Sequence, residues 1–290
     1  VRVVVLTRDP EAFAAKAPHL HSHKNFEFVI GDIKKFSIPS GHFTHLIHAA
    51  TDASASLNEN DPLTMLDTIT VGTRHILNLA VAKNILRTLF LSSGAVYGQQ
   101  PWEMVRVPED WMGAPDCNDP KNTYAEGKRN AELLCSIYHK QFDTQISIAR
   151  IFSLLGPYLP LDSHYAAGNF IRDAIKGRPI IVQGDGSPCR SYLYASDLII
   201  WLLNLLVVGS AGKPYNVGSD ETVSIKDLAK QVSAVLSDGT IEIKGAEDTG
   251  WNPGRYVPDT GSAARDLGLY KKVTLDEAIR RTALWNGWKP

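Results

Sequence analysis

Residues 86–98 read Leu-Arg-Thr-Leu-Phe-Leu-Ser-Ser-Gly-Ala-Val-Tyr-Gly, an apolar run that leads directly into two serines and a turn. A short apolar run bounded by turn residues is typical of a strand buried on both faces of a parallel sheet. An open α/β sheet carries its active site at the carboxyl ends of its strands. We therefore interpret Ser93, at that end, as a candidate catalytic hydroxyl, with an ordinary turn serine before glycine as the alternative.

The flanking segments alternate between strands and helices. The sequence pattern predicts further strands over residues 1–6, 26–30, 44–48 and 145–149, and helices over residues 62–83 and 124–140. This alternation predicts an α/β fold with a doubly wound, parallel, Rossmann-type sheet. Glycine and proline become frequent later in the chain and favour a smaller substrate-binding region there. We predict a dinucleotide-binding domain over residues 1–155. Residues 156–290 are then mainly substrate-binding, with segments that return to the main domain.

Composition narrows the class of protein. The 290 residues carry a formal net charge of −1 and no basic run, which argues against a nucleic-acid partner. The longest apolar stretch, residues 198–208, is shorter than the roughly 20 residues that a membrane span needs, so we expect no membrane partner. The three cysteines, Cys117, Cys135 and Cys189, are widely spaced. They favour a reducing, cytoplasmic compartment and neither a disulfide framework nor a metal site.

Tyr124 and Lys128 stand four residues apart on a predicted helix, so their side chains project from the same face. A phenol titrates near pH 10, and a nearby ammonium stabilises its phenolate form. Such a tyrosine can exchange a proton with a sugar hydroxyl while a hydride moves to or from nicotinamide. The alternative is a core tyrosine beside a solvated lysine.

A glycine-rich loop over residues 184–192 contains Arg190. The planar guanidinium group suits forked hydrogen bonding to a phosphate. The alternative is a solvated loop arginine.

The order of these segments resembles the extended short-chain dehydrogenase/reductase family of nucleotide-sugar epimerases, dehydratases, decarboxylases and reductases. The resemblance spans nearly the whole chain. It is carried by Gly31-Asp32-Ile33, His48-Ala49-Ala50, Val71-Gly72-Thr73, residues 92–98, residues 124–128, residues 150–157, residues 184–197 and residues 255–268. It implies an NAD- or NADP-dependent enzyme, without a metal, that acts as a homodimer on a nucleotide-diphosphate sugar.

The resemblance implies a role for several residues near the start of the chain. Asp32 and Ile33 are expected to bracket the adenine, and Ala49 and Ala50 are expected to pass beneath the coenzyme. We interpret His48, at a strand end, as a core residue rather than a catalytic one.

Thr7 and Arg8 end the first predicted strand, where relatives that prefer NAD carry an acid for the ribose hydroxyls. An arginine there can pair with a 2′-phosphate. We therefore predict a slight preference for NADP, with a solvated Arg8 as the alternative.

The remaining roles concern chemistry and substrate. The resemblance implies that Ser93, Tyr124 and Lys128 are the catalytic residues and that Lys128 also reaches the nicotinamide ribose. By the same resemblance Asn169, Arg190 and Arg255 bind the nucleotide diphosphate.

The two positions after Ser93 bear on the reaction. Dehydratases resembling this chain carry two acids there, and decarboxylases keep the second, because elimination needs an acid and a base. Here the residues are Gly94 and Ala95. We therefore favour a 4-epimerase, with an NADP-dependent keto-sugar reductase as the alternative. From another class, a binding protein of this fold without turnover stays open.

A dinucleotide-binding sheet normally opens with a strand and a glycine-rich turn at a helix N-terminus. The sequence contains no such turn before its first predicted strand. In the family's strand order the absent strand is central, so the strands over residues 1–6 and 44–48 are expected to lack a common partner. We expect some 20–30 preceding residues, roughly the strand-turn-helix share of a βαβ unit.

Overall fold

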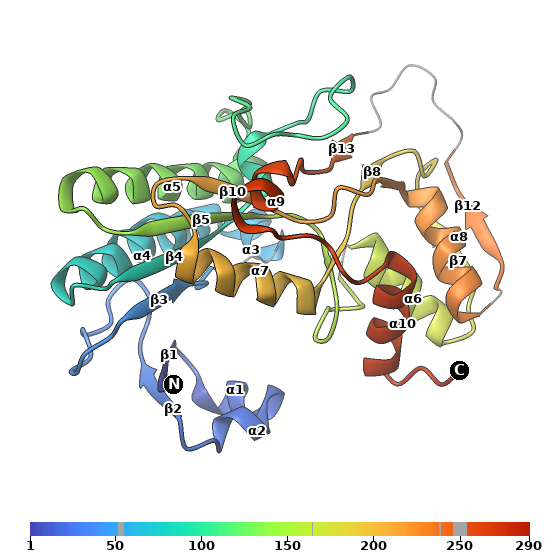
Figure 1. Cartoon of the computed structure of the whole chain (residues 1–290). Helices are drawn as coiled ribbons and strands as arrows, with labels where there is room; N and C mark the ends of the chain where they lie inside the picture. The colour runs from blue at the N-terminus through green and yellow to red at the C-terminus, as the bar shows by residue number, and fades with distance from the viewer. Residues whose placement is uncertain (52–54, 164, 238, 246–253) are drawn as a thin grey trace. The chain divides into compact units, whose positions relative to one another are not determined.

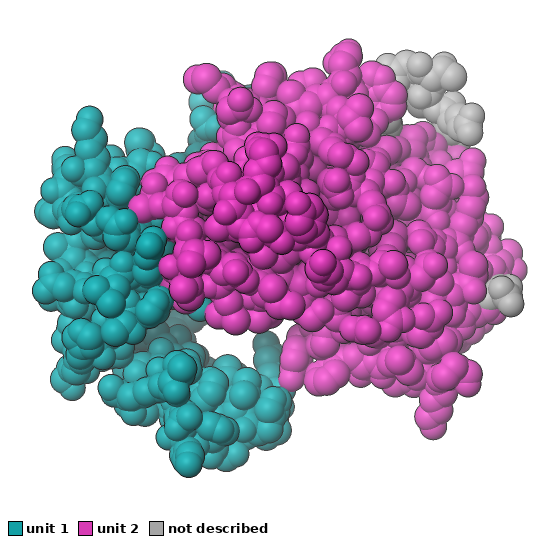
Figure 2. Space-filling model, viewed as in Figure 1, with its two compact units in different colours: residues 1–90, 116–146 teal, residues 91–115, 147–290 magenta. Residues whose placement is uncertain are grey.

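The computed structural model describes residues 1–51, 55–163, 165–237, 239–245 and 254–290. It consists of two compact units, unit 1 with residues 1–90 and 116–146, and unit 2 with residues 91–115 and 147–290 (Figures 1 and 2). Each unit consists of two separate stretches of sequence, so the units do not correspond to a single boundary. The division into a dinucleotide-binding domain and a substrate-binding region at residue 155 stays a prediction. None of the helices in these ranges is long and apolar enough to span a membrane.

Unit 1 alternates strands with helices, as the sequence predicts. Its elements are β1 (Val3–Thr7), α1 (Pro10–Lys16), α2 (Pro18–His21), β2 (Phe26–Ile30), β3 (His45–His48), α3 (Ala55–Asn60), α4 (Pro62–Ala82), β4 (Arg87–Ser93), a 3₁₀ turn η2 (Pro120–Asn122) and α5 (Thr123–Phe142). The last three residues of β4 belong to unit 2.

The strands of unit 1 pair in parallel in two separate ladders. In one, β1 runs beside β2 from Val3 opposite Phe26 onward. In the other, β3 runs beside β4, with His48 opposite Phe90. Within the described ranges β1 and β3 share no ladder, as the sequence predicts for these two strands. The parallel α/β architecture confirms the predicted fold class.

Helix α4 shows why the hydrophobic spacing predicted it so closely. Asp61 caps its first turn by accepting a hydrogen bond from the amide of Thr64, and Pro62 occupies the first helical position, where no amide donor is needed. Its buried residues recur every three or four positions and are Met65, Ile69, Gly72, Thr73, Ile76, Leu77, Leu79 and Ala80. This face packs against α5, where a Cβ on Gly127 would lie 3.0 Å from Ile69 Cδ1.

Unit 2 contains shorter elements. They are a 3₁₀ turn η1 (Gly94–Tyr97), most of β5 (Ile146–Ile151), β6 (Leu154–Leu155), α6 (Ala166–Ile175), β7 (Ile180–Val182), β8 (Cys189–Arg190), β9 (Leu193–Tyr194), α7 (Ala195–Val208), β10 (Pro214–Val217), β11 (Val223–Ser224), α8 (Ile225–Leu236), β12 (Ile241–Ile243), β13 (Arg255–Tyr256), α9 (Gly261–Leu267) and α10 (Leu275–Trp285). Helices α6, α8 and α10 pack together around a large apolar core. Strand β8 lies between β11 and β13.

A smaller core in unit 2 surrounds the turn after Ser93. Val96, Tyr97, Val107 and Phe152 form it, and the Phe152 ring lies 4.6 Å from the ring of Tyr256. The ring of Phe152 also fills the space beside Gly94, where a Cβ would lie 2.6–2.8 Å from three ring atoms. Glycine is therefore required at position 94 by the packing of Phe152.

We predict that Gly94→Ala lowers the free energy of unfolding by about 1–3 kcal/mol, the usual cost of overpacking a core. The control is Gly184→Ala, because a Cβ there meets no atom within 4 Å. Urea unfolding of both variants measures the difference. If Gly94→Ala unfolds at the same urea concentration as the wild type, the contact with Phe152 does not restrict this position.

Candidate active site

The start of α5 positions Tyr124 in unit 1. The backbone amide of Tyr124 donates to Asn58 Oδ1 at 2.9 Å, and Asn58 Nδ2 donates to the carbonyl of Lys121 at 2.8 Å. Asn58, on α3, thus holds both the first turn of α5 and the residues before it. No sequence signal marked Asn58, which lies 66 residues away from Tyr124.

Lys128 is buried one helical turn further along α5, with 3% of its surface exposed. Its ammonium donates to Thr51 Oγ1 at 2.9 Å and lies 4.9 Å from the centroid of the Phe90 ring. It also lies 5.9 Å from the centroid of the Tyr124 ring. Burial lowers the pKa of Lys128 to about 8. The solvated lysine considered as an alternative is therefore wrong.

His48, at the end of β3, is a core residue, as predicted. It is 3% exposed, and its Nε2 lies 2.8 Å from Thr73 Oγ1 on α4. Burial lowers the pKa of His48 to about 3, and the nearby charge of Lys128 acts in the same direction. The imidazole is therefore neutral at physiological pH.

The predicted coenzyme residues all lie in unit 1 with Tyr124 and Lys128. Asp32 accepts a hydrogen bond from the amide of Lys34 at 2.8 Å, and Ile33 is buried between α4 and Phe36. Ala49 and Ala50 are exposed and directly precede Thr51, the partner of the Lys128 ammonium.

Thr7 and Arg8 follow the end of β1. The hydroxyl of Thr7 accepts from the amide of Asp9 at 3.2 Å, which makes a local turn, and Arg8 is exposed. Asp9 caps α1 by accepting from the amide of Ala12. An acid therefore occupies the N-terminus of the helix that follows β1.

Ser93 belongs to unit 2, where its hydroxyl caps η1 by accepting from the amide of Ala95 at 3.2 Å. The same oxygen lies 3.4 Å from the hydroxyl of Tyr256 on β13. Tyr256 is a second hydroxyl beside Ser93 that sequence reasoning missed.

Arg190 and Arg255 lie on two neighbouring strands of unit 2. Strands β8 and β13 run parallel, with Arg255 opposite Cys189 and Tyr256 opposite Arg190. Arg190 donates to the carbonyl of Cys189 at 2.8 Å. Arg255 Nε is buried without a hydrogen-bond partner among the described residues, and its guanidinium lies 5.2 Å from the centroid of the Trp102 ring. Because successive side chains of a strand alternate between its faces, this register places Arg190 on the face of Tyr256 and Arg255 on the face of Cys189. The buried Nε donor of Arg255 suits a phosphate oxygen.

Asn169, the third predicted substrate residue, lies on α6 in the same unit. It borders a pocket of about 230 Å³ together with Phe170, Arg172, Ile181 and Gln183. In the ranges that the structure describes, no group of three or more His, Cys, Asp or Glu side chains is arranged to hold a metal ion.

Comparison with known proteins identifies the family. The model of the NAD dependent epimerase/dehydratase family matches residues 1–218. UDP-glucuronic acid decarboxylase 3 of Arabidopsis thaliana is 32% identical over 257 residues, which cover 89% of this chain and 73% of that protein. This chain belongs to the NAD dependent epimerase/dehydratase family. The resemblance inferred from the sequence is thereby confirmed.

Two solved structures share the fold of this epimerase/dehydratase family member. UDP-glucose 4-epimerase from Thermotoga maritima, solved with UDP-glucose, superposes with a TM-score of 0.82 at 19% identity, covering 98% of this chain and 90% of that one. UDP-glucuronic acid 4-epimerase from Bacillus cereus, in complex with UDP-glucuronic acid and NAD, gives 0.81 at 20% identity with the same coverage.

The residues of this family member fit a nicotinamide dinucleotide in part. Ala49 and Ala50 are exposed after the end of β3, and the next residue, Thr51, accepts a hydrogen bond from the Lys128 ammonium. This strand end suits the ribose and nicotinamide. The N-terminus of α1 does not suit the pyrophosphate, because the carboxylate of Asp9 already takes an amide there.

We predict that Lys128→Met raises the free energy of unfolding at pH 7 by about 1–3 kcal/mol, because it removes a charge from the interior. The pKa of Lys128 is lower in the folded than in the unfolded chain. Wild-type stability therefore rises with pH between about 8 and 10.5, and the advantage of the variant shrinks over that range.

Urea unfolding at pH 7 and pH 10 measures this difference. The control is Lys140→Met, because Lys140 is an exposed lysine on the same helix. A Lys128→Met protein that is no more stable than the wild type at pH 7 would show that the ammonium is well solvated.

Proposed function

We propose that this member of the epimerase/dehydratase family inverts a carbinol centre of a nucleotide-diphosphate sugar, as a 4-epimerase does. Oxidation of the carbinol and return of the hydride to the opposite face of the ketone give the epimer. The observation that carries this proposal is that neither position after Ser93 holds an acid. The Phe152 ring leaves no room for a side chain at Gly94, and the next residue is Ala95.

Tyr124 is the proton-transferring group in this proposal. Its phenolate removes the proton from the sugar hydroxyl during oxidation, and the resulting phenol returns it during reduction. The buried Lys128 ammonium lies on the same helix face and favours the phenolate form electrostatically. Burial strengthens this effect, because little water screens the charge.

Ser93 and the two arginines act on other parts of the substrate. The Ser93 oxygen already accepts from an amide, so its own proton can be donated to the sugar oxygen. Arg190 and Arg255 bind the diphosphate, with the unpaired Nε of Arg255 as one donor. Diphosphate binding at these arginines orients the sugar for the chemical step.

A nicotinamide coenzyme, when bound, accepts and returns the hydride. The ribose of this coenzyme is assigned to Lys128, and its adenine to the segment around Asp32. Arg8 is exposed and able to meet a 2′-phosphate, which supports the slight preference for NADP.

Decarboxylation of a nucleotide-linked uronic acid is the second candidate. It is favoured by the 32% identity to a UDP-glucuronic acid decarboxylase. Oxidation of the carbinol next to the carbon that bears the carboxylate gives a β-keto acid, which readily loses carbon dioxide. The two candidates therefore share the oxidation step and differ in the fate of the ketone.

Incubation of the protein with UDP-glucuronic acid or UDP-glucose and either coenzyme separates the candidates. We predict a product of unchanged mass that is a stereoisomer of the substrate, detected by chromatography with mass spectrometry. Loss of carbon dioxide from UDP-glucuronic acid would establish the decarboxylase instead.

Two further measurements on the same protein have outcomes that contradict both candidates. Net consumption of reduced coenzyme with nucleotide-linked keto-sugars, without epimer or carbon dioxide, would indicate a reductase. Tight binding of a panel of UDP- and dTDP-sugars without any turnover would indicate a binding protein.

A further inference from the structure

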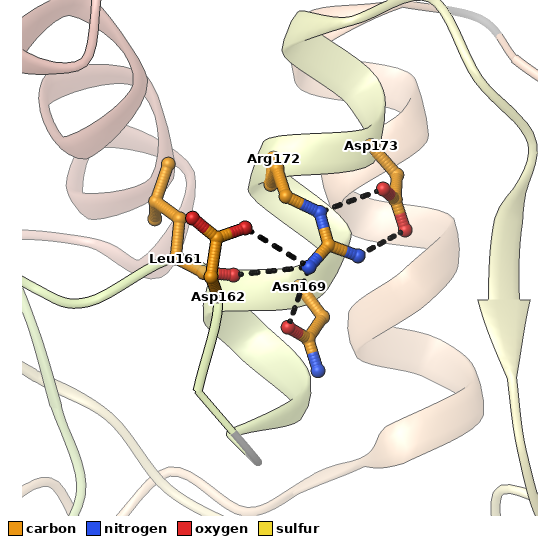
Figure 3. Close-up of polar contacts among 5 residues, drawn as sticks. All are labelled: Leu161, Asp162, Asn169, Arg172 and Asp173. Atoms are coloured by element: carbon orange, nitrogen blue, oxygen red, sulfur yellow. Dashed lines mark hydrogen bonds and ion pairs between the residues drawn. The ribbon is translucent and has the colours of Figure 1, made fainter.

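Arg172, on α6, has its guanidinium group fixed from two sides. Nε and one terminal nitrogen donate to the two carboxylate oxygens of Asp173 at 2.9 and 3.0 Å. The other terminal nitrogen lies 3.1 Å from Asn169 Oδ1, 3.3 Å from Asp162 Oδ1 and 3.4 Å from the carbonyl of Leu161 (Figure 3). The forked pair with Asp173 holds the guanidinium plane so that its remaining edge faces Asn169.

This contact determines which way the Asn169 carboxamide faces. Arginine has donors and no acceptor, so only the amide oxygen can point toward it. The amide nitrogen then points away from Arg172, as Figure 3 shows. Asn169 also borders the pocket that Phe170, Ile181 and Gln183 help to line.

We propose that Arg172 is a positioning residue that holds the Asn169 amide nitrogen as a hydrogen-bond donor for the nucleotide of the substrate. This inference rests on the proposed function, with Asn169 in the role that the family resemblance implies, as a residue that binds the nucleotide diphosphate. Without Arg172 the carboxamide is free to turn over and present its oxygen, which repels the oxygens of a phosphate or a base carbonyl.

The expected size of the effect follows from populations. If a free carboxamide presents its nitrogen for only a third to a tenth of the time, apparent affinity falls by the same factor. Deletion of the amide removes the hydrogen bond altogether, which typically weakens binding by about tenfold. An effect of Arg172 that acts through Asn169 vanishes once Asn169 is gone.

Calorimetric titration with UDP and with dTDP tests this on the full protein. We expect Arg172→Met to raise the Kd about three- to tenfold and Asn169→Ala about tenfold, with the double variant no weaker than Asn169→Ala alone. Arg178→Met, a change at an exposed arginine soon after α6, should bind like the wild type. For a nucleotide sugar that is turned over, Arg172→Met should raise KM and leave kcat unchanged.

Asn169→Asp provides an independent variant if Arg172→Met folds poorly. Its carboxylate keeps the contact with Arg172 but has no N–H to donate, so we expect at least a tenfold loss of UDP affinity. Wild-type affinity in Asn169→Asp would overturn the proposal. An equal loss from Arg172→Met with and without Asn169 would overturn it too, since Arg172 would then act directly. A wild-type protein that binds neither UDP nor dTDP would instead remove the proposed function itself.

Discussion

The proposed chemistry depends on an ammonium group that is kept out of water. Lys128 is tolerated in the interior because the Thr51 hydroxyl accepts a hydrogen bond from its ammonium and the face of Phe90 lies beneath its charge. Lys128 lies on α5, which packs closely against α4 where the small Gly127 faces Ile69. The lowered pKa shows that these contacts only partly offset the loss of hydration. Burial adds little to a purely structural role of a lysine. It strengthens the electrostatic attraction between an ammonium and a phenolate, because less water screens the two charges.

The residues of unit 2 that are proposed to bind the substrate are also fixed by contacts. They lie on helices and strands, which limits their movement. The pairing of β8 with β13 sets Tyr256 opposite Arg190, and the hydroxyl of Tyr256 lies 3.4 Å from that of Ser93. Asp173 orients Arg172, and Arg172 in turn orients Asn169. Groups held in this way lose little freedom when a ligand binds, so more of each contact contributes to affinity and orientation.

The sequence predicts the elements of unit 1 well because their signals are local. The helix expected over residues 62–83 is α4, and the strand expected over residues 26–30 is β2. The site is only partly predictable. The spacing of Tyr124 and Lys128 is local, whereas Thr51 lies 77 residues from Lys128, and Tyr256 lies 163 residues from Ser93. Two-residue strands such as β8 and β13 carry no readable periodicity, so their pairing could not be predicted from the sequence.

The central claim is that the Tyr124 phenol transfers the proton while the rest of the machinery binds and orients the sugar. It is tested most directly by measuring turnover and UDP affinity together in Tyr124→Phe, with Tyr138→Phe as the control tyrosine on the same helix. The account predicts that Tyr124→Phe lowers kcat by about 10²–10⁴-fold, the usual contribution of a positioned proton-transferring group, and leaves UDP affinity within twofold of the wild type. A Tyr124→Phe protein that retains near-normal kcat would contradict it.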